Sequence, residues 1–321
     1  MKPTFKLLVL LIAASIAYSL ESFTYIDAER LQDSSLFKTK EGENRYLEAY
    51  KKALALWPVE YREVDLKTSF GKAHVIISGA ERGNPLVLLH GMNASSTMWY
   101  PNVQALSATH TIYAIDFIGE PGRSVPVKSL KTSEDIVKWY DEVFDKLNLN
   151  TIDIAGASRG GWIALQLALH STKKIKHVVL LSPAQSLVHV KPKKAVVKNL
   201  YFMLRPQREK LRSTLKTVSS DVDKLEDPFV EQYYRCLENM KVDPDFLKMD
   251  VYSDKELEAL KMPVLVLIGD DDIFNSSKSI SRAKQHIPLI ETGVVKNSGH
   301  FLSIDQAETV NQQILAFLSK G

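Results

Sequence analysis

Residues 150–162 read NTIDIAGASRGGW, a β-branched run followed by the pattern G-x-S-x-G and then by an apolar segment. Gly156 and Gly160 stand two residues before and after Ser158, where larger side chains would clash on a sharp strand-to-helix turn. The segment after Ser158 is apolar almost all round, which predicts a helix buried against a sheet. The pattern alone also fits an ordinary glycine-rich turn. In a nucleophile elbow, Ser158 would be the nucleophile and the Arg159 N–H an oxyanion donor at the helix N-terminus.

Short apolar runs typical of buried strands alternate with helical patterns on both sides of this stretch. Such alternation indicates an α/β fold with a right-handed, mostly parallel sheet and helices on both faces. The closing helix is predicted to begin at Asp305 as N-cap, with Glu308 completing a capping box. Two runs near the N-terminus, 61–66 and 73–78, predict a hairpin at the sheet edge. The other expected strands are 85–90, 110–116, 150–156, 176–182, 262–269 and 289–296.

The alternation stops between Ala184 and about Lys261, where helical character continues without strands. This interval predicts a helical cap inserted after the sixth strand. Its first part is basic, and we interpret it as a solvated helix face in preference to a membrane contact. The predicted organisation is 1–20 as a signal peptide or N-terminal anchor, 21–183 as the first part of the core, 184–261 as the cap and 262–321 as the second part of the core.

The N-terminus carries Lys2 and Lys6 before an apolar run from Leu7 to about Leu20. Ser15-Ile-Ala17 offers a small-x-small cleavage position, so the segment predicts a secretory signal peptide. The protein is then expected to be secreted or extracytoplasmic, and the lack of cysteine pairs favours a bacterial source. The alternative is an uncleaved segment that anchors the chain in a membrane.

Composition excludes several classes of partner. The chain has 321 residues, 45% of them apolar and 25% charged, and a net charge of +3 gives no reason to expect a nucleic acid. A single cysteine, Cys236, excludes an intrachain disulfide. The eight histidines lack metal-ligand spacing, so no metal site is expected, and membrane contact is expected only through an uncleaved N-terminal segment.

Further chemistry-bearing residues follow the predicted strands. Met92 lies just past strand 85–90, where an acyl-transfer enzyme of this layout places its second oxyanion donor. His300 follows the last strand, whereas His90 is interpreted as a residue that braces its loop. Asp116 is interpreted as a turn cap. The strand ending at Gly269 is followed by three acids, Asp270, Asp271 and Asp272.

The order Ser158, Asp, His300, with each residue just past a strand, makes the chain resemble the α/β-hydrolase superfamily, particularly small bacterial carboxylesterase-like members. The resemblance covers roughly Tyr61 to Leu318. Members commonly place the acid third after the glycine, which implies Asp272, and a position some way into the loop also reaches His300 best. The chain departs from the family where the D-x-x-G-x-G-x-S turn, here 116–124, is longer by one residue.

The resemblance implies ester hydrolysis through an acyl-enzyme on Ser158, with His300 as base and no cofactor. The expected substrate is a small or medium acyl ester, enclosed by the cap in a pocket that includes Trp99, Phe274 and Phe301. Thioesterases, carbon–carbon bond hydrolases, lipases and cofactor-free perhydrolases use the same residues. Some proteins of this fold instead bind ligands as receptors or signalling partners with little or no turnover.

Overall fold

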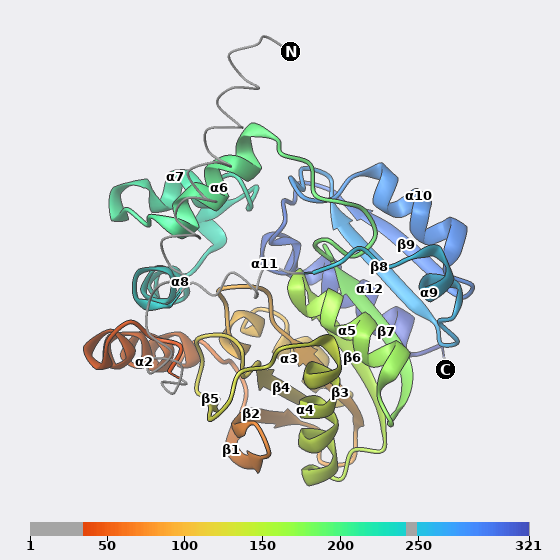
Figure 1. Ribbon diagram of the computed structural model, residues 1–321. Helices are drawn as coiled ribbons and strands as arrows, with labels where there is room; N and C mark the ends of the chain where they lie inside the picture. Colours follow the sequence, from red (N-terminus) through yellow and green to blue (C-terminus); the bar gives the residue numbers. More distant parts are fainter. Residues whose placement is uncertain (1–34, 242–248, 321) are drawn as a thin grey trace. The chain divides into compact units, whose positions relative to one another are not determined.

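The computed structural model describes residues 35–241 and 249–320, and a twisted sheet with helices on both faces forms its centre (Figure 1). Within these residues nine strands pair in the order β1-β2-β4-β3-β6-β7-β8-β9, with the short β5 beside β2. The strands are β1 (Tyr61–Thr68), β2 (Gly71–Gly79), β3 (Asn84–Leu89), β4 (His110–Asp116), β5 (Val125–Pro126), β6 (Thr151–Ala157), β7 (Lys174–Leu181), β8 (Val264–Gly269) and β9 (Ile290–Val295).

The sheet is parallel from β4 through β9, and β1 and β2 form the predicted antiparallel hairpin at its edge. The central strands are buried on both faces, which explains why they are almost wholly apolar. Side chains alternate between two hydrophobic clusters, so that Leu86 and Leu88 belong to one and Val87 and Leu89 to the other. The predicted α/β architecture is confirmed.

Each cluster is closed by its own set of helices. Helices α2, α3 and α12 share the first cluster with the cap, while α4, α5 and α10 share the second. The α-helices are α2 (Lys40–Leu54), α3 (Val103–Ser107), α4 (Ser133–Lys146), α5 (Arg159–His170), α6 (Lys194–Leu204), α7 (Leu211–Leu215), α8 (Asp227–Asn239), α9 (Asp254–Glu258), α10 (Ser277–His286), α11 (Leu302–Asp305) and α12 (Ala307–Leu318). Short 3-10 turns are η2 (Ser96–Trp99), η3 (Arg208–Lys210) and η4 (Val222–Lys224).

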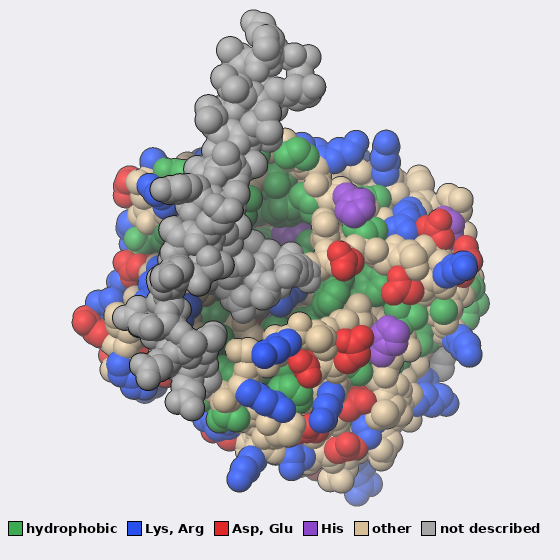
Figure 2. Space-filling view, in the orientation of Figure 1, with side chains coloured by type: hydrophobic (Ala, Val, Ile, Leu, Met, Phe, Trp, Pro, Cys, Tyr) green, Lys and Arg blue, Asp and Glu red, His purple; other side chains and the backbone are tan. Residues whose placement is uncertain are grey.

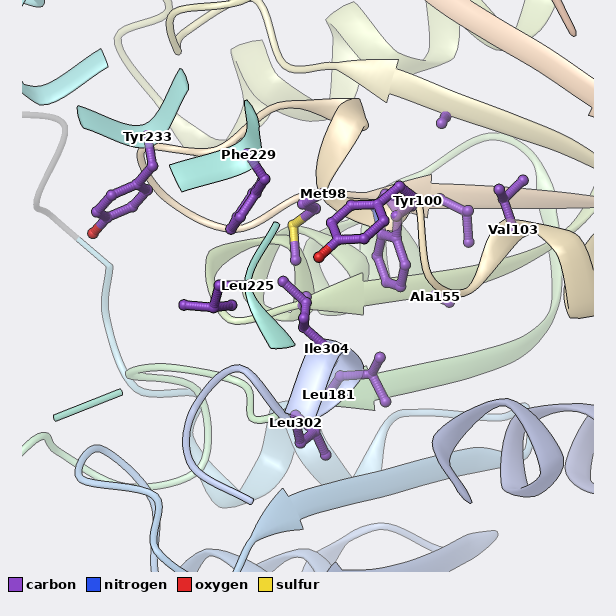
Figure 3. Close-up of a cluster of buried hydrophobic side chains, with 14 of the residues drawn as sticks. Met98, Tyr100, Val103, Ala155, Leu181, Leu225, Phe229, Tyr233, Leu302 and Ile304 are labelled. Carbon is purple, nitrogen blue, oxygen red and sulfur yellow. The ribbon is translucent and has the colours of Figure 1, made fainter. Parts of the chain in front are cut away.

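Helices α6, α7 and α8 form the cap. Its inner side is apolar: Phe229 of α8 and Leu225, just before this helix, lie near Met98 and Ile304 of α11, and Tyr233 belongs to the same hydrophobic cluster (Figure 3). Burial of such side chains contributes about 1.5–3 kcal/mol each, so the cap is held mainly by apolar packing.

The later part of the predicted cap interval packs elsewhere. Helix α9 lies beside α10, and Leu257 belongs to the second cluster with α4 and α5. The domain boundaries at 183 and 261 stay predictions.

The predicted signal peptide or anchor, residues 1–20, lies outside the described residues and stays a prediction. None of the described helices is long and apolar enough to span a bilayer.

On the face shown in Figure 2, acidic and basic side chains are interspersed, as expected for the small net charge.

Candidate active site

Ser158 occupies the junction between β6 and α5 in strained backbone. Its φ of 52° and ψ of −114° place an L-residue in a region that few side chains adopt. A Cβ on Gly156 would overlap the carbonyl oxygen of Gly160, and a Cβ on Gly160 would overlap that of Leu89. The Ser158 N–H donates to the Leu181 carbonyl at 2.8 Å, which ties the turn to β7. The predicted strand-turn-helix around G-x-S-x-G is therefore confirmed, together with the steric need for both glycines.

Ser158, His300 and Asp272 form one hydrogen-bonded chain. His300 Nε2 lies 2.8 Å from Ser158 Oγ, and His300 Nδ1 lies 3.1 Å from Asp272 Oδ1. The three residues follow β6, β9 and β8, whose carboxyl ends meet at one edge of the parallel sheet. Because an ionised carboxylate accepts from Nδ1–H, Nε2 carries the lone pair and can accept the proton of the Ser158 hydroxyl.

Asp272 is the one of the three neighbouring acids that contacts His300. Burial alone would raise the pKa of Asp272, but the charge and hydrogen bond of His300 oppose this. With the bonds donated by Phe274 N at 2.8 Å and Asn275 Nδ2 at 3.0 Å, they lower the pKa to about 2. Asp270 and Asp271 are exposed, and Asp270 accepts instead from the Ser298 N–H.

The loop after β3 approaches Ser158 closely. A Cβ on Gly91 would stand 3.4 Å from Ser158 Cβ. Among the described residues, none accepts a hydrogen bond from the Met92 N–H next to it. His90 braces the loop: its Nδ1–H donates to the Gly91 carbonyl at 2.9 Å, and its Nε2 accepts from Phe117 N at 2.9 Å. Burial lowers the pKa of His90 and favours this neutral form, so the interpretation of His90 as a brace is confirmed.

Two of the three residues predicted to line the pocket lie beside His300. The Phe274 ring meets the imidazole edge-on at 4.6 Å between centroids, and the half-buried Phe301 lies between His300 and Tyr233 of the cap. The position of Trp99 does not support the prediction, because its side chain is 0% exposed in the core beneath the cap. Figure 2 shows a recess floored by hydrophobic side chains beside α6.

Asp305 does not cap the closing helix. It ends the short helix α11, and α12 begins at Ala307 after Gln306, so the predicted capping box is wrong. The Asp305 carboxylate accepts instead from Gly299 N at 2.8 Å, Ser220 N at 2.9 Å and Ser219 Oγ at 2.5 Å. These three donors hold the carboxylate away from the helix terminus. They join the loop that carries His300 to the cap.

Glu120 is a further buried acid that the sequence did not mark directly. It is 0% exposed and pairs with the guanidinium of Arg159, the residue after Ser158. Its only sequence signal is the extra residue in the turn 116–124. Asp116 in the same turn accepts from Ser96 N and Arg123 N, both at 2.8 Å, which confirms its role as a turn cap.

Within the described parts of the chain, no three His, Cys, Asp or Glu side chains are grouped to hold a metal ion.

Comparison with known proteins agrees with this fold. The family model for the alpha/beta hydrolase fold matches residues 84–221. The chain is 33% identical to "Carboxylesterase YbfK" of Bacillus subtilis (strain 168) over 297 residues, covering 91% of this chain and 99% of the relative. It is 32% identical to "Uncharacterized carboxylesterase nap" of the same organism, covering 89% and 96%.

Solved structures show the same similarity. The crystal structure of naproxen esterase from Bacillus subtilis matches with a TM-score of 0.81 at 31% identity, covering 88% of this chain and 99% of that one. That of carboxylesterase CesB (YbfK) matches with 0.80 at 33% identity and the same coverage. The chain therefore belongs to the α/β-hydrolase family. Within that family it is a carboxylesterase-like hydrolase.

Gly156→Ala tests the steric constraint at the elbow. The new methyl group overlaps a backbone oxygen that cannot move without breaking α5, so we expect a loss of about 3 kcal/mol in the free energy of unfolding. Urea denaturation measures the change. Gly91→Ala is the control, because its Cβ would make only ordinary contacts at 3.4 Å and beyond, and it should change stability by less than about 1 kcal/mol. Equal stabilities of the two variants would contradict this account.

Asp305→Ala tests the link between the His300 loop and the cap. It leaves three donors without their carboxylate, which should cost about 3 kcal/mol or more of unfolding free energy. Asp271→Ala, at an exposed acid of the neighbouring loop, should stay within about 0.5 kcal/mol. A wild-type melting temperature for Asp305→Ala would show that the three hydrogen bonds contribute little.

Proposed function

We propose that the protein hydrolyses small-molecule carboxylic esters through an acyl-enzyme on Ser158, with His300 and Asp272 completing a catalytic triad. The observation that carries the proposal is the hydrogen-bonded chain from Ser158 Oγ through His300 to Asp272. The similarity to carboxylesterases supports the ester as substrate class.

In the first half-reaction His300 Nε2 removes the hydroxyl proton as Ser158 Oγ attacks the ester carbonyl. The negative oxygen of the tetrahedral intermediate is stabilised by the N–H groups of Met92 and Arg159, the proposed oxyanion donors. His300 then returns the proton to the departing alcohol, and the acyl group stays on Ser158. In the second half-reaction His300 Nε2 removes a proton from water as the water oxygen attacks the acyl carbonyl. The bond between the acyl group and Ser158 Oγ then breaks, His300 returns the proton to Oγ, and the carboxylic acid leaves.

Asp272 holds His300 in the required tautomer and stabilises the imidazolium that forms. Its pKa of about 2 keeps the carboxylate ionised throughout the neutral range. The rings of Phe274 and Phe301 beside His300 suit an apolar substrate group, since aromatic side chains bury large apolar areas. We therefore propose esters with small or medium apolar acyl groups.

Ser158→Ala should lower kcat for p-nitrophenyl esters by at least about 10⁴-fold while leaving the circular dichroism spectrum unchanged, because the small side chain suits the turn. A fluorophosphonate probe should label the wild type and not this variant. Ser319→Ala, at an exposed serine of the C-terminal turn, is the matched control and should keep both properties. Probe labelling that persists in Ser158→Ala would refute the nucleophile. Absence of turnover in the wild type, with ligand-induced thermal stabilisation, would favour a receptor.

The three neighbouring acids give a second test. Asp272→Asn should lower kcat by about 10⁴-fold, because the amide favours the wrong tautomer and removes the charge that stabilises the imidazolium. Asp271→Asn should lower kcat by much less than tenfold, since Asp271 is exposed outside the chain of hydrogen bonds. Steady-state kinetics of both variants, each checked for folding, measures the two values of kcat. Retention of activity by Asp272→Asn would exclude this residue as the third member of the triad.

A further inference from the structure

One buried carboxylate contacts both segments that carry the proposed oxyanion donors. Glu120 Oε2 accepts from Asn93 N at 2.7 Å, and Asn93 directly follows Met92. Glu120 Oε1 accepts from Arg159 Nη1 at 3.1 Å, and Arg159 directly follows Ser158. The loop after β3 and the first turn of α5 are therefore connected through a single side chain.

The lengthened turn positions the Glu120 carboxylate. Glu120 lies in 116–124, where the chain has one residue more than the family pattern. The turn is fixed from several sides: the Glu120 N–H donates to the Phe117 carbonyl at 3.0 Å, and Tyr46 of α2 donates to the Pro121 carbonyl at 2.7 Å. The Arg159 guanidinium also lies 5.1 Å from the centre of the Phe117 ring. Such a turn positions a carboxylate rigidly.

The surroundings of Glu120 make Arg159 its counter-charge. The titratable groups that face it are Arg159 on α5, Tyr140 on α4, and Tyr233 and Cys236 on α8. Burial raises the pKa values of both tyrosines and of the cysteine, so these groups are neutral near pH 7.

The charge of Glu120 itself depends on pH near neutrality. Burial raises its pKa, the Arg159 charge and the Asn93 N–H oppose this, and the result is about 7. Protonation below about pH 7 removes the charge that faces the guanidinium. The charged form, which holds Arg159 most strongly, therefore predominates only above that pH.

We propose that Glu120 is a positioning residue that sets the separation of the two oxyanion donors through Asn93 and Arg159. This inference rests on the proposed ester hydrolysis at Ser158. An oxyanion exists in the tetrahedral intermediate and not in the bound ester, so donor placement affects acylation and leaves substrate binding unchanged. Loss of an ion pair that only stabilises the fold would change neither the acylation rate nor substrate binding per active site.

The experiment is Glu120→Gln, which keeps an acceptor for the Asn93 N–H and removes the charge facing Arg159. Single-turnover kinetics gives the acylation rate constant and the substrate dissociation constant, each per active site titrated with a fluorophosphonate. We expect acylation to slow by about 10- to 100-fold, a part of the loss seen when one oxyanion donor is removed. The substrate dissociation constant should change by less than about threefold. The affinity for an alkylboronic acid, which forms a tetrahedral adduct, should fall in parallel with acylation.

The pH profile provides a readout that a purely structural role would not move. In the wild type, acylation should fall as protonation below about pH 7 removes the charge of Glu120. In Glu120→Gln this part of the pH dependence should be absent.

Asp153→Asn is the matched control. Asp153 is a buried carboxylate paired with His177 at 2.8 Å, at the amino end of β6 and away from Ser158. It should lower the melting temperature while leaving acylation and boronate affinity per active site within about twofold, below about 0.4 kcal/mol of barrier.

Removal of the Glu120 charge beside the buried Arg159 guanidinium destabilises the fold, so Glu120→Gln is accompanied by the double variant Glu120→Gln/Arg159→Met. The double variant removes both charges of the pair and should show the same slow acylation. Wild-type acylation and boronate affinity in whichever of the two variants folds would overturn the inference. If Ser158→Ala is inactive in that case, only the role of Glu120 fails. If Ser158→Ala is active, the proposed function itself fails.

Discussion

The positive φ of Ser158 is the constraint on which the rest of the structure depends. This backbone conformation turns the chain sharply from β6 into α5, so that the hydroxyl projects from the end of the sheet. Such a turn requires contact between backbone atoms that a side chain would separate, which explains Gly156 and Gly160. The strain is maintained because β7 and the buried first part of α5 hold the turn from both sides.

Several buried carboxylates surround the elbow, and each accepts hydrogen bonds from more than one residue. Asp272 accepts from His300 and its own loop, Asp305 joins the His300 loop to the cap, and Glu120 joins the elbow to the loop after β3. A buried carboxylate is costly unless donors surround it, so each arrangement fixes the segments it contacts. The loops at the carboxyl edge of the sheet are thereby held rigidly, although loops usually vary most in a fold.

The cap is held differently from these loops, mainly by apolar contacts. Phe229 and Leu225 belong to its apolar inner side, and the buried polar residue Gln232 of α8 also contacts the core. Gln232 bonds to Ser95 and Thr97 in the loop after β3, and to Tyr46 on α2. The cap is thus fixed in register against the part of the core that carries the proposed oxyanion donor.

The sequence by itself determined the sheet, the elbow and the order of Ser158 and His300, because glycine spacing and apolar periodicity are local properties of the chain. It also indicated Asp272, whose contact with His300 the structure shows. Only the tertiary structure decided the partners of Glu120 and Asp305 and the burial of Trp99, since these depend on residues brought together from distant segments. The sequence does not show which residues donate hydrogen bonds to a given carboxylate, so the role of that carboxylate depends on the fold.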